Sequence, residues 1–497
     1  MKNNPYVGPR PYERKDQHNF YGRSREARDL RALIVSEWEV LFYAQSGAGK
    51  TSLLNAMVIP ALEERGFCVL PVARVGGELP QGIEPQEVDN VFVFGALLTL
   101  AGEDADPQTL LPHTLASFLA ERYPEPEDAF ESQPLVLIFD QFEEIFTSHR
   151  NRWQDAKGFF RQMRKALDAL PRLGVVFSMR EDHVAEIDPY ASLFPRRLKA
   201  RFRMERLGPT RALVAVSKPA ENAGCSFDSG VAGRLVDDLR RTRVQRYTGS
   251  KEKTVITGPF VEPIQLQVVC HRLWENLPEQ EDYAIQWEEV EEYGNIDRAL
   301  TDFYKGALDS TMQQTGVGEG ELRQWVGQKL ITPAGTRGLV MRGAEDTEGL
   351  PNAAVDALEG LHLIRVDVRA EARWYELVHD HLTSSIIQAN TAWRQAHPLL
   401  HTALEWQEAG KPANKLYQGG RLAAAWNDPD AKMELVRAFL HAGQQAQEDR
   451  EAAIRAEEGQ KRREVEIRAE EQSRANRRLR WLVAALVVVL VLVVMQT

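Results

Sequence analysis

The sequence has few cysteines, only Cys68, Cys225 and Cys270 in 497 residues, and they lie far apart. An odd number at this spacing fits neither a disulfide framework nor a zinc site, so it predicts a reducing compartment. The N-terminus lacks an apolar run behind a basic start. We therefore expect no secretory signal, and we expect synthesis to finish in the cytoplasm.

Positive charge is also scarce relative to negative charge, with 61 Lys and Arg against 72 Asp and Glu and a formal net charge of −11. A protein that wraps nucleic acid needs concentrated cations, so we expect no nucleic-acid partner. An internal repeat is absent as well. The length predicts about three modules at roughly 150 residues per domain.

One long apolar run is present, at 481–495, directly behind Arg474, Arg477, Arg478 and Arg480. We interpret it as a transmembrane helix, with the arginines keeping the preceding domains in the cytoplasm. The run is short for a hydrocarbon core of about 30 Å, so we expect the sequence to be cut inside or just after its membrane helix. A buried hydrophobic helix and an aggregation-prone β-rich tail are the alternatives.

Residues 1–205 alternate short apolar runs with amphipathic stretches, which predicts a parallel α/β sheet covered on both faces. Strands are expected at 40–43, 68–75, 135–139 and 174–178. Helical spacing of apolar residues occurs at 97–100, 115–122 and 156–170.

The remaining chain is mainly helical in pattern. We predict a helical lid at 206–315, a winged helix at 316–390 and a helical region at 391–445. A solvated charged helix at 446–480 and the transmembrane segment at 481–495 follow. The winged helix is expected from helices near 321–330 and 353–361 followed by a β-hairpin at 361–378. Its second helix has no Lys or Arg, which disfavours DNA binding.

The segment SGAGKTS follows an apolar strand and opens an apolar helical pattern, as a phosphate-binding loop does. Its residues are Ser46, Gly47, Ala48, Gly49, Lys50, Thr51 and Ser52. Backbone N–H groups of such a loop point at phosphate oxygens, and the lysine reaches the β- and γ-phosphates. The segment therefore predicts an NTP site, with ATP and GTP both open. A Gly-rich strand-to-helix connection without ligand is the alternative.

An acidic cluster ends the apolar strand of LVLIFDQFEE. Asp140 is expected beside the loop, where it would bind Mg²⁺ through water while the Thr51 hydroxyl ligates the ion directly. Glu143 and Glu144 are both candidates to polarise the attacking water. The residues do not decide between them, and at least one is expected to begin a solvated helix.

Arg180 follows the next strand, GVVFS, and should lie one strand over from Asp140. An arginine there can sense the γ-phosphate, so we count it with the catalytic candidates. The alternative is an ion pair with Glu181 or Asp182.

These features resemble the STAND class of signalling ATPases, and more closely its bacterial novel-STAND branch. Six blocks in that branch's order carry the resemblance, which covers the chain from about residue 5 to the C-terminal apolar run: PYVGPRPYERKDQHNFYGRSREARDL, LFYAQSGAGKTSLLNAMVIPAL, LIFDQFEEIFT, SMREDHVAEIDP, VEPIQLQVVCHRLW and YELVHDHL. The resemblance implies an AAA+- and STAND-like P-loop NTPase with a lid and a winged helix. It also implies ATP or ADP and Mg²⁺ as cofactors.

The resemblance implies further nucleotide-binding residues. Those on the adenine and ribose side would be Tyr21, Gly22 and Arg23, with surface solvation as the alternative for Arg23. His379 resembles the winged-helix histidine that holds the β-phosphate of ADP, although a lone histidine is more often structural. Pro219 would be the lid proline near the base.

Two departures from the family pattern stand out. Ala44 replaces the usual first glycine of the loop, which predicts a shifted turn. Gln141 stands where many relatives have an acid, which puts fast turnover in doubt.

The function that follows is a membrane-tethered ATP switch, resting with ADP and self-associating with ATP, in bacterial signalling or antiphage defence. An unknown protein sensor or effector is expected, and it would lie beyond Thr497. A non-hydrolysing nucleotide-binding scaffold is the alternative, and a winged-helix transcription regulator is less favoured.

Overall fold

The computed structural model describes residues 4–494 apart from 77–78, 81, 103, 125–132, 246–252, 279, 281, 334, 370–371 and 379–381. The chain forms two compact units, Met1–Gln388 and Ala389–Thr497. All of the described strands lie in the first unit, and the described elements of the second are helices.

A five-stranded parallel sheet forms the centre of the first unit, in the order β2-β3-β4-β1-β5. Its strands are β1 Glu39–Ala44, β2 Cys68–Val69, β3 Leu135–Phe139, β4 Leu173–Arg180 and β5 Ala200–Arg203. The predicted parallel α/β sheet is thereby confirmed. Since β4 lies between β1 and β3, the carboxyl ends of these three strands meet at one edge, where parallel sheets bind ligands.

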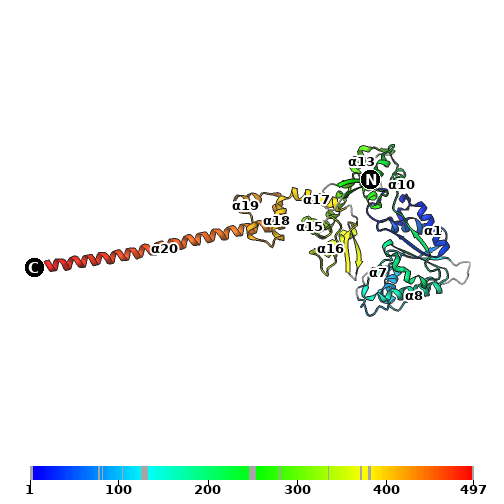
Figure 1. The fold of residues 1–497 in the computed structure, drawn as a ribbon, viewed down its shortest axis with the longest axis horizontal. Helices are drawn as coiled ribbons and strands as arrows, with labels where there is room; N and C mark the ends of the chain where they lie inside the picture. Colours follow the sequence, from blue (N-terminus) through cyan, green and yellow to red (C-terminus); the bar gives the residue numbers. More distant parts are fainter. Residues whose placement is uncertain are drawn as a thin grey trace. The chain divides into compact units, whose positions relative to one another are not determined.

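Side chains of the strands alternate between two separate cores, as the two-residue period of a strand requires. Leu41, Leu137 and Val175 face one core, and Val40, Ile138 and Val176 face the other. The first core also contains α4 Val91–Ala101, α6 Leu115–Arg122 and α8 Gln154–Ala169. The second contains α1 Ser24–Glu37 and the helical run α2 Lys50–Leu53, η2 Leu54–Val58 and α3 Ile59–Glu63. Helices therefore cover both faces, and α1 and α8 can be followed in Figure 1.

Two details of this sheet differ from the prediction. The strand expected at 68–75 pairs continuously only at Cys68–Val69, because Pro71 has no N–H to donate to a ladder; Ala73 then makes an isolated bridge to Phe139. The edge strand β5 was not predicted. Its four residues alternate between partly buried and exposed in the order Ala, Arg, Phe, Arg. This pattern is too short and contains too few apolar residues to predict a strand.

Short helices complete this domain: η1 Arg14–Asn19, α5 Pro107–Leu110, α7 Glu144–Thr147, η4 Arg150–Arg152, η5 Glu181–His183, α9 Val184–Ile187 and η6 Asp188–Leu193. The predicted helical stretch after residue 205 contains α10 Pro209–Asn222, α11 Val231–Leu239, α12 Pro263–Glu275, α13 Trp287–Tyr293 and α14 Ile296–Thr315. It also contains two strand pairs that were not predicted, β6 Cys225–Phe227 with β9 Tyr283–Ile285 and β7 Arg241–Gln245 with β8 Lys253–Thr257.

The elements expected for a winged helix are present between 319 and 377. They are α15 Glu319–Lys329, β10 Val340–Met341, β11 Asp346–Thr347, β12 Leu350–Pro351, α16 Asn352–Gly360, β13 Ile364–Arg369 and β14 Ala372–Leu377. Strands β13 and β14 form the predicted antiparallel hairpin, and β10 adds a third strand beside β14.

Helix α17 Leu382–Ala396 begins in the first unit and ends in the second. The second unit contains α18 Pro398–Glu408, η7 Ala413–Lys415, α19 Gly419–Ala425, η8 Pro429–Lys432 and α20 Glu434–Val494. Trp406 and Phe439 lie in its small apolar core. Figure 1 shows α20 as one continuous helix.

Helix α20 passes through the predicted charged helix and into the apolar run at 481–494. In the described part of the chain, no helix combines the length and the apolar character needed to cross a membrane. The apolar end of α20 rises only about 21 Å, against a hydrocarbon core of about 30 Å, and three arginines lie within the turn before it. The predicted transmembrane segment at 481–495 is therefore not found.

Candidate active site

The phosphate-binding loop joins β1 to the helical run that starts at Lys50. Gly47 and Gly49 adopt φ angles of 75° and 92°, which only glycine takes without strain. Ala44 does not need that freedom, since it is the last residue of β1 and pairs with Arg180 in the β1–β4 ladder. The shifted turn predicted from Ala44 is thus wrong, because the turn starts after this position.

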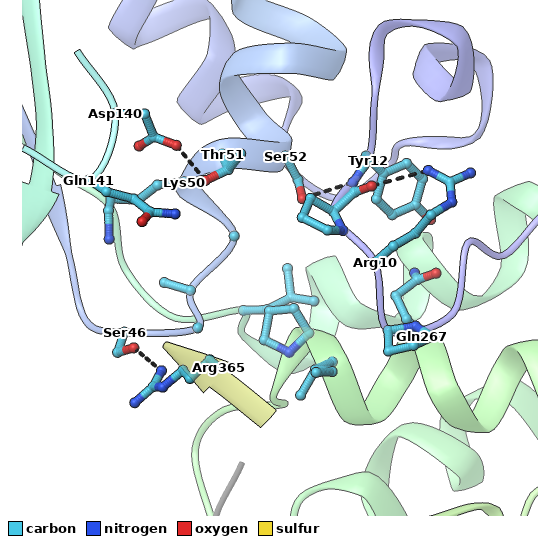
Figure 2. Close-up of a pocket in the computed structure, with 18 of the residues that line it drawn as sticks. Arg10, Tyr12, Ser46, Lys50, Thr51, Ser52, Asp140, Gln141, Gln267 and Arg365 are labelled. Carbon is cyan, nitrogen blue, oxygen red and sulfur yellow. Dashed lines mark hydrogen bonds between the residues drawn. The ribbon is translucent and has the colours of Figure 1, made fainter. Parts of the chain in front are cut away.

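A cavity of about 350 Å³ opens over this loop. The predicted site residues that line it are Tyr21, Arg23, Ser46, Gly47, Ala48, Gly49, Lys50, Thr51, Ser52, Asp140, Glu143, Glu144 and Arg180. Gly22 and Pro219 do not line it. His379 lies outside the described residues. Figure 2 shows the loop on one side of the cavity and a strand tip carrying Arg365 close to Ser46.

Thr51 and Asp140 meet at the carboxyl edge of the sheet. The Thr51 hydroxyl donates to Asp140 Oδ2 at 2.6 Å (Figure 2). The Ser178 hydroxyl on β4 donates to Asp140 Oδ1 at 2.7 Å. Hydroxyl and carboxylate oxygens are the donors that Mg²⁺ prefers, and in such sites phosphates and water supply the other ligands. The pair therefore fits Mg²⁺, even though the described residues contain no group of three or more His, Cys, Asp and Glu side chains suited to a metal.

The adjacent glutamates have different surroundings. Glu144 forms an ion pair with Arg74, and its Oε2 accepts from the Gly76 N–H at 3.0 Å. Glu143 accepts from the Arg180 N–H at 3.0 Å and interacts electrostatically with Lys50. Glu143 is thus the carboxylate directed at the phosphate end of the loop, whereas Glu144 holds the segment around Arg74.

Burial changes the pKa values of the two charged groups nearest the loop. It lowers the pKa of Lys50, against the opposing effects of Glu143 and Asp140. Burial also raises the pKa of Glu143, which Lys50 partly offsets. Lys50 and Glu143 are both partly buried, so an added anion such as a phosphate would interact with Lys50 more strongly than in bulk water.

Arg180 makes the ion pair that was weighed as its alternative role. Its Nη2 lies 2.6 Å from Asp182 Oδ2, while its backbone N–H binds Glu143. The side chain still lines the cavity from the end of β4. Arg180 therefore lies where it was predicted, one strand over from Asp140.

Arg23 is buried and is not solvated at the surface. It donates to the Ala48 carbonyl of the loop at 3.1 Å, to Glu26 at 2.8 Å and to the Glu205 carbonyl at 2.8 Å. Arg211 of α10 binds the same Glu26 carboxylate. Arg23 thus connects the loop to α1 and, through Glu26, to α10.

The family model for novel STAND NTPase 1 matches residues 5–414. The chain belongs to this family. The family predicted from the six sequence blocks is confirmed. No relative was found among curated proteins.

Solved structures give weaker similarities. A Walker-type ATPase of Pyrococcus abyssi matches with a TM-score of 0.37 and 13% identity, covering 76% of this chain and 98% of that one. The ORC2 protein of Aeropyrum pernix in ADPNP–ADP complexes has a TM-score of 0.37 and 14% identity, covering 75% and 95%. The ORC1 protein of Aeropyrum pernix in complex with DNA has a TM-score of 0.34 and 13% identity, covering 75% and 93%.

Several residues of this novel STAND NTPase line the cavity without having been predicted. Most come from the N-terminal segment 8–12, from the start of α12 at 263–267 and from β13, where Arg365 and Val366 lie; the others are Phe20, Gln141, Thr147, Leu207 and Ala215. The first two segments are parts of the sequence blocks PYVGPRPY and VEPIQLQ, so the family blocks were a signal for them. No local pattern marks Arg365, because its place depends on a contact 319 positions away in the chain.

Pro219 lies one helical turn from a residue that lines the cavity. It is buried inside α10 and has no N–H, so it cannot donate to the carbonyl of Ala215, which is four residues earlier and lines the cavity. Tyr21 also contacts α10, since its hydroxyl accepts from Asn222 at 2.5 Å.

Gly22 has a packing role that gives a first prediction. A Cβ there would lie 2.6 Å from the Arg211 carbonyl oxygen, at a φ of +85°. We expect Gly22→Ala to lower the free energy of unfolding by about 3 kcal/mol, because it combines strain with a backbone clash. Denaturant unfolding measures this loss. The control Gly66→Ala has a φ of +82° but nothing within 4 Å, so it should lose only about 1 kcal/mol. Equal losses would exclude the contact with α10 as the cause.

Proposed function

We propose that this NTPase is a slow ATPase that acts as a signalling switch, compact with ADP and self-associating with ATP. The observation that carries the proposal is the Thr51–Asp140 contact at 2.6 Å, in the same cavity as Lys50 and Glu143. When bound, Mg²⁺ supplies charge that neutralises the β- and γ-phosphates. Thr51 and Asp140 would hold it, Lys50 would bind the phosphates, and Glu143 would take a proton from water.

A lid and a winged helix are proposed as the moving parts. Helices α10–α14 act as the lid and the segment 319–377 as the winged helix. Ala215 of α10, Pro263 of α12 and Arg365 of β13 all line the cavity, so a bound nucleotide would touch three elements outside the sheet. Differential contact of ATP and ADP with these elements can shift a conformational equilibrium. From the family resemblance we also propose His379 as a β-phosphate ligand in the ADP state.

A non-hydrolysing scaffold is the second candidate. Gln141 supports it, because its side chain accepts from Arg74 at 2.6 Å and offers no carboxylate beside Asp140. In this case the nucleotide would stabilise the fold and would not be turned over. Ala44 gives this candidate no support, since it lies within β1.

The location is proposed from the apolar end of α20, and the signalling role from the family resemblance. We propose attachment to a membrane through the exposed apolar side chains at the end of α20, including Trp481, Leu482 and Leu486, and a role in bacterial signalling or antiphage defence. A partner protein that senses or transmits the signal is part of the same proposal. The expected absence of a nucleic-acid partner stays a prediction.

One preparation tests the proposal. Cells expressing the chain are fractionated, the protein is purified, and its nucleotide is released by acid and identified. Phosphate release is then measured with Mg²⁺ and ATP or GTP, and the mass in solution is measured with ADP and with a non-hydrolysable ATP analogue. We expect bound ADP, slow release from ATP, a larger mass with the analogue and recovery in the membrane fraction. Tight nucleotide binding without any phosphate release would support the scaffold.

A further inference from the structure

Arg365 lines the cavity, and the proposed function gives its guanidinium no specific ligand. It lies on β13, in the 319–377 segment, and its Nη1 donates to the Ser46 hydroxyl of the phosphate-binding loop at 2.5 Å (Figure 2). This bond joins two parts of the chain that are 319 residues apart. The guanidinium therefore lies against the loop that would surround a bound phosphate.

Glu376 on the partner strand β14 holds the Arg365 guanidinium in place. Its carboxylate accepts from Arg365 Nε at 2.8 Å and also contacts Nη2. The same carboxylate lies 3.4 Å from Arg337 Nη1. Because Nε and Nη2 face Glu376, Nη1 is the part of the fork that is directed at the loop.

Arg365 shares the cavity with the residues that are proposed to act on the terminal phosphate. Ser46 begins the loop, and Lys50, Arg180 and Glu143 line the same cavity. Arg365 and Arg180 also border a second groove, beside Ser46 and Gly47. Two guanidinium groups therefore flank the loop from different elements, one from the sheet and one from the hairpin.

A guanidinium is well suited to a phosphate oxygen, since it remains charged and offers several donors in a fixed plane. ATP differs from ADP by one phosphoryl group, and a donor at that group adds affinity for the triphosphate alone. A serine hydroxyl is a weaker partner for a guanidinium than a phosphate oxygen is.

We propose that Arg365 is a ligand of the terminal phosphate and makes the site prefer a nucleoside triphosphate to a diphosphate. Glu376 positions the guanidinium. The inference rests on the proposed function, in which the loop holds the nucleotide. It adds that the β13–β14 hairpin exchanges its contact with Ser46 for one with the γ-phosphate, so that the 319–377 segment responds to which nucleotide is bound.

The test compares dissociation constants for ADP and for a non-hydrolysable ATP analogue, each with Mg²⁺. For Arg365→Ala we expect affinity for the analogue to fall about 10-fold, the equivalent of one charge-assisted hydrogen bond, while affinity for ADP stays within about 2-fold. Arg365→Lys keeps the charge, so it should recover part of the loss. Glu376→Gln should weaken analogue binding less than Arg365→Ala does.

Arg373→Ala is the matched control, because Arg373 lies on the same hairpin, pairs with Glu359 and does not line the cavity. It should leave both constants unchanged. If the wild-type protein binds neither nucleotide, the proposed function itself fails. A second outcome is that the wild type binds both nucleotides and that Arg365→Ala and Arg365→Lys have the same ratio of analogue to ADP affinity as the wild type, whether or not both affinities fall. That outcome overturns only the role of Arg365.

Discussion

Replacing Lys50 by alanine is expected to lower the affinity for both ATP and ADP by about 100-fold or more. Lys50 lines the cavity from the start of the helical run, and burial lowers the pKa of its ammonium group. A bound phosphate would replace the water lost on burial, so the two charges would interact in a poorly hydrated site. Removing one member of such a pair costs roughly 2–5 kcal/mol.

The measurement is the rise in melting temperature on adding nucleotide with Mg²⁺. A ligand at 100 times its dissociation constant stabilises the folded state by about 2.7 kcal/mol, and a ligand at its dissociation constant by only about 0.4 kcal/mol. The wild type should therefore show a clear rise and Lys50→Ala little or none. Lys218→Ala is the control, because Lys218 pairs with Glu221 on α10 and does not line the cavity. An equal rise in the Lys50 variant would show that nucleotide does not bind at this loop.

The features that the sequence predicted well are those encoded locally. Strand β3 is a continuous apolar run, and Asp140 follows it directly, so the position of the carboxylate at the sheet edge depends only on strand direction. The loop residues Gly47 and Gly49 needed no long-range information either, since their backbone conformation is the reason that they are glycines. Edge strand β5 lacks such a signal, because Arg201 and Arg203 occupy alternate positions and hide its apolar side.

The features that were missed depend on packing between distant segments. Nothing near Arg365 in the sequence indicates that Ser46 will be its partner, and nothing near Arg23 indicates burial under the Ala48 carbonyl. At the apolar end of α20, a local pattern alone predicted a transmembrane segment. No helix among the described residues has the length and apolar character of one.

The choice between Glu143 and Glu144 was also beyond the sequence, because neighbouring glutamates have the same local pattern. The structure separates them through Arg74, which pairs with Glu144 from the segment after β2. Gln141 contributes to this arrangement, since it adopts a φ of 53° and also accepts from Arg74. The turn after β3 thus directs one carboxylate to the loop and the other to Arg74.

Glu143→Gln is expected to lower the rate of ATP hydrolysis by about 100- to 1,000-fold while nucleotide binding is kept, because glutamine cannot accept a proton from the attacking water. Phosphate release and binding are measured on the same protein. Burial raises the pKa of Glu143, so hydrolysis by the wild type should rise with pH along a limb that lies above the usual range for glutamate. The variant should lack this limb.

Glu144→Gln is the matched comparison, since it makes the same chemical change one residue away. It breaks the ion pair with Arg74 and weakens the bond to the Gly76 N–H, so we expect it to lower the free energy of unfolding by about 2 kcal/mol. Glu143→Gln should not destabilise the fold in this way.

A raised pKa of the Glu143 carboxyl means that folding favours its protonated form. The stability that this form contributes is therefore present at low pH and is lost as pH rises through the folded pKa. A neutral glutamine avoids that loss. If phosphate release falls equally in Glu143→Gln and Glu144→Gln, Glu143 is not the base. If wild-type release does not exceed that of Glu143→Gln, the nucleotide is held without being hydrolysed.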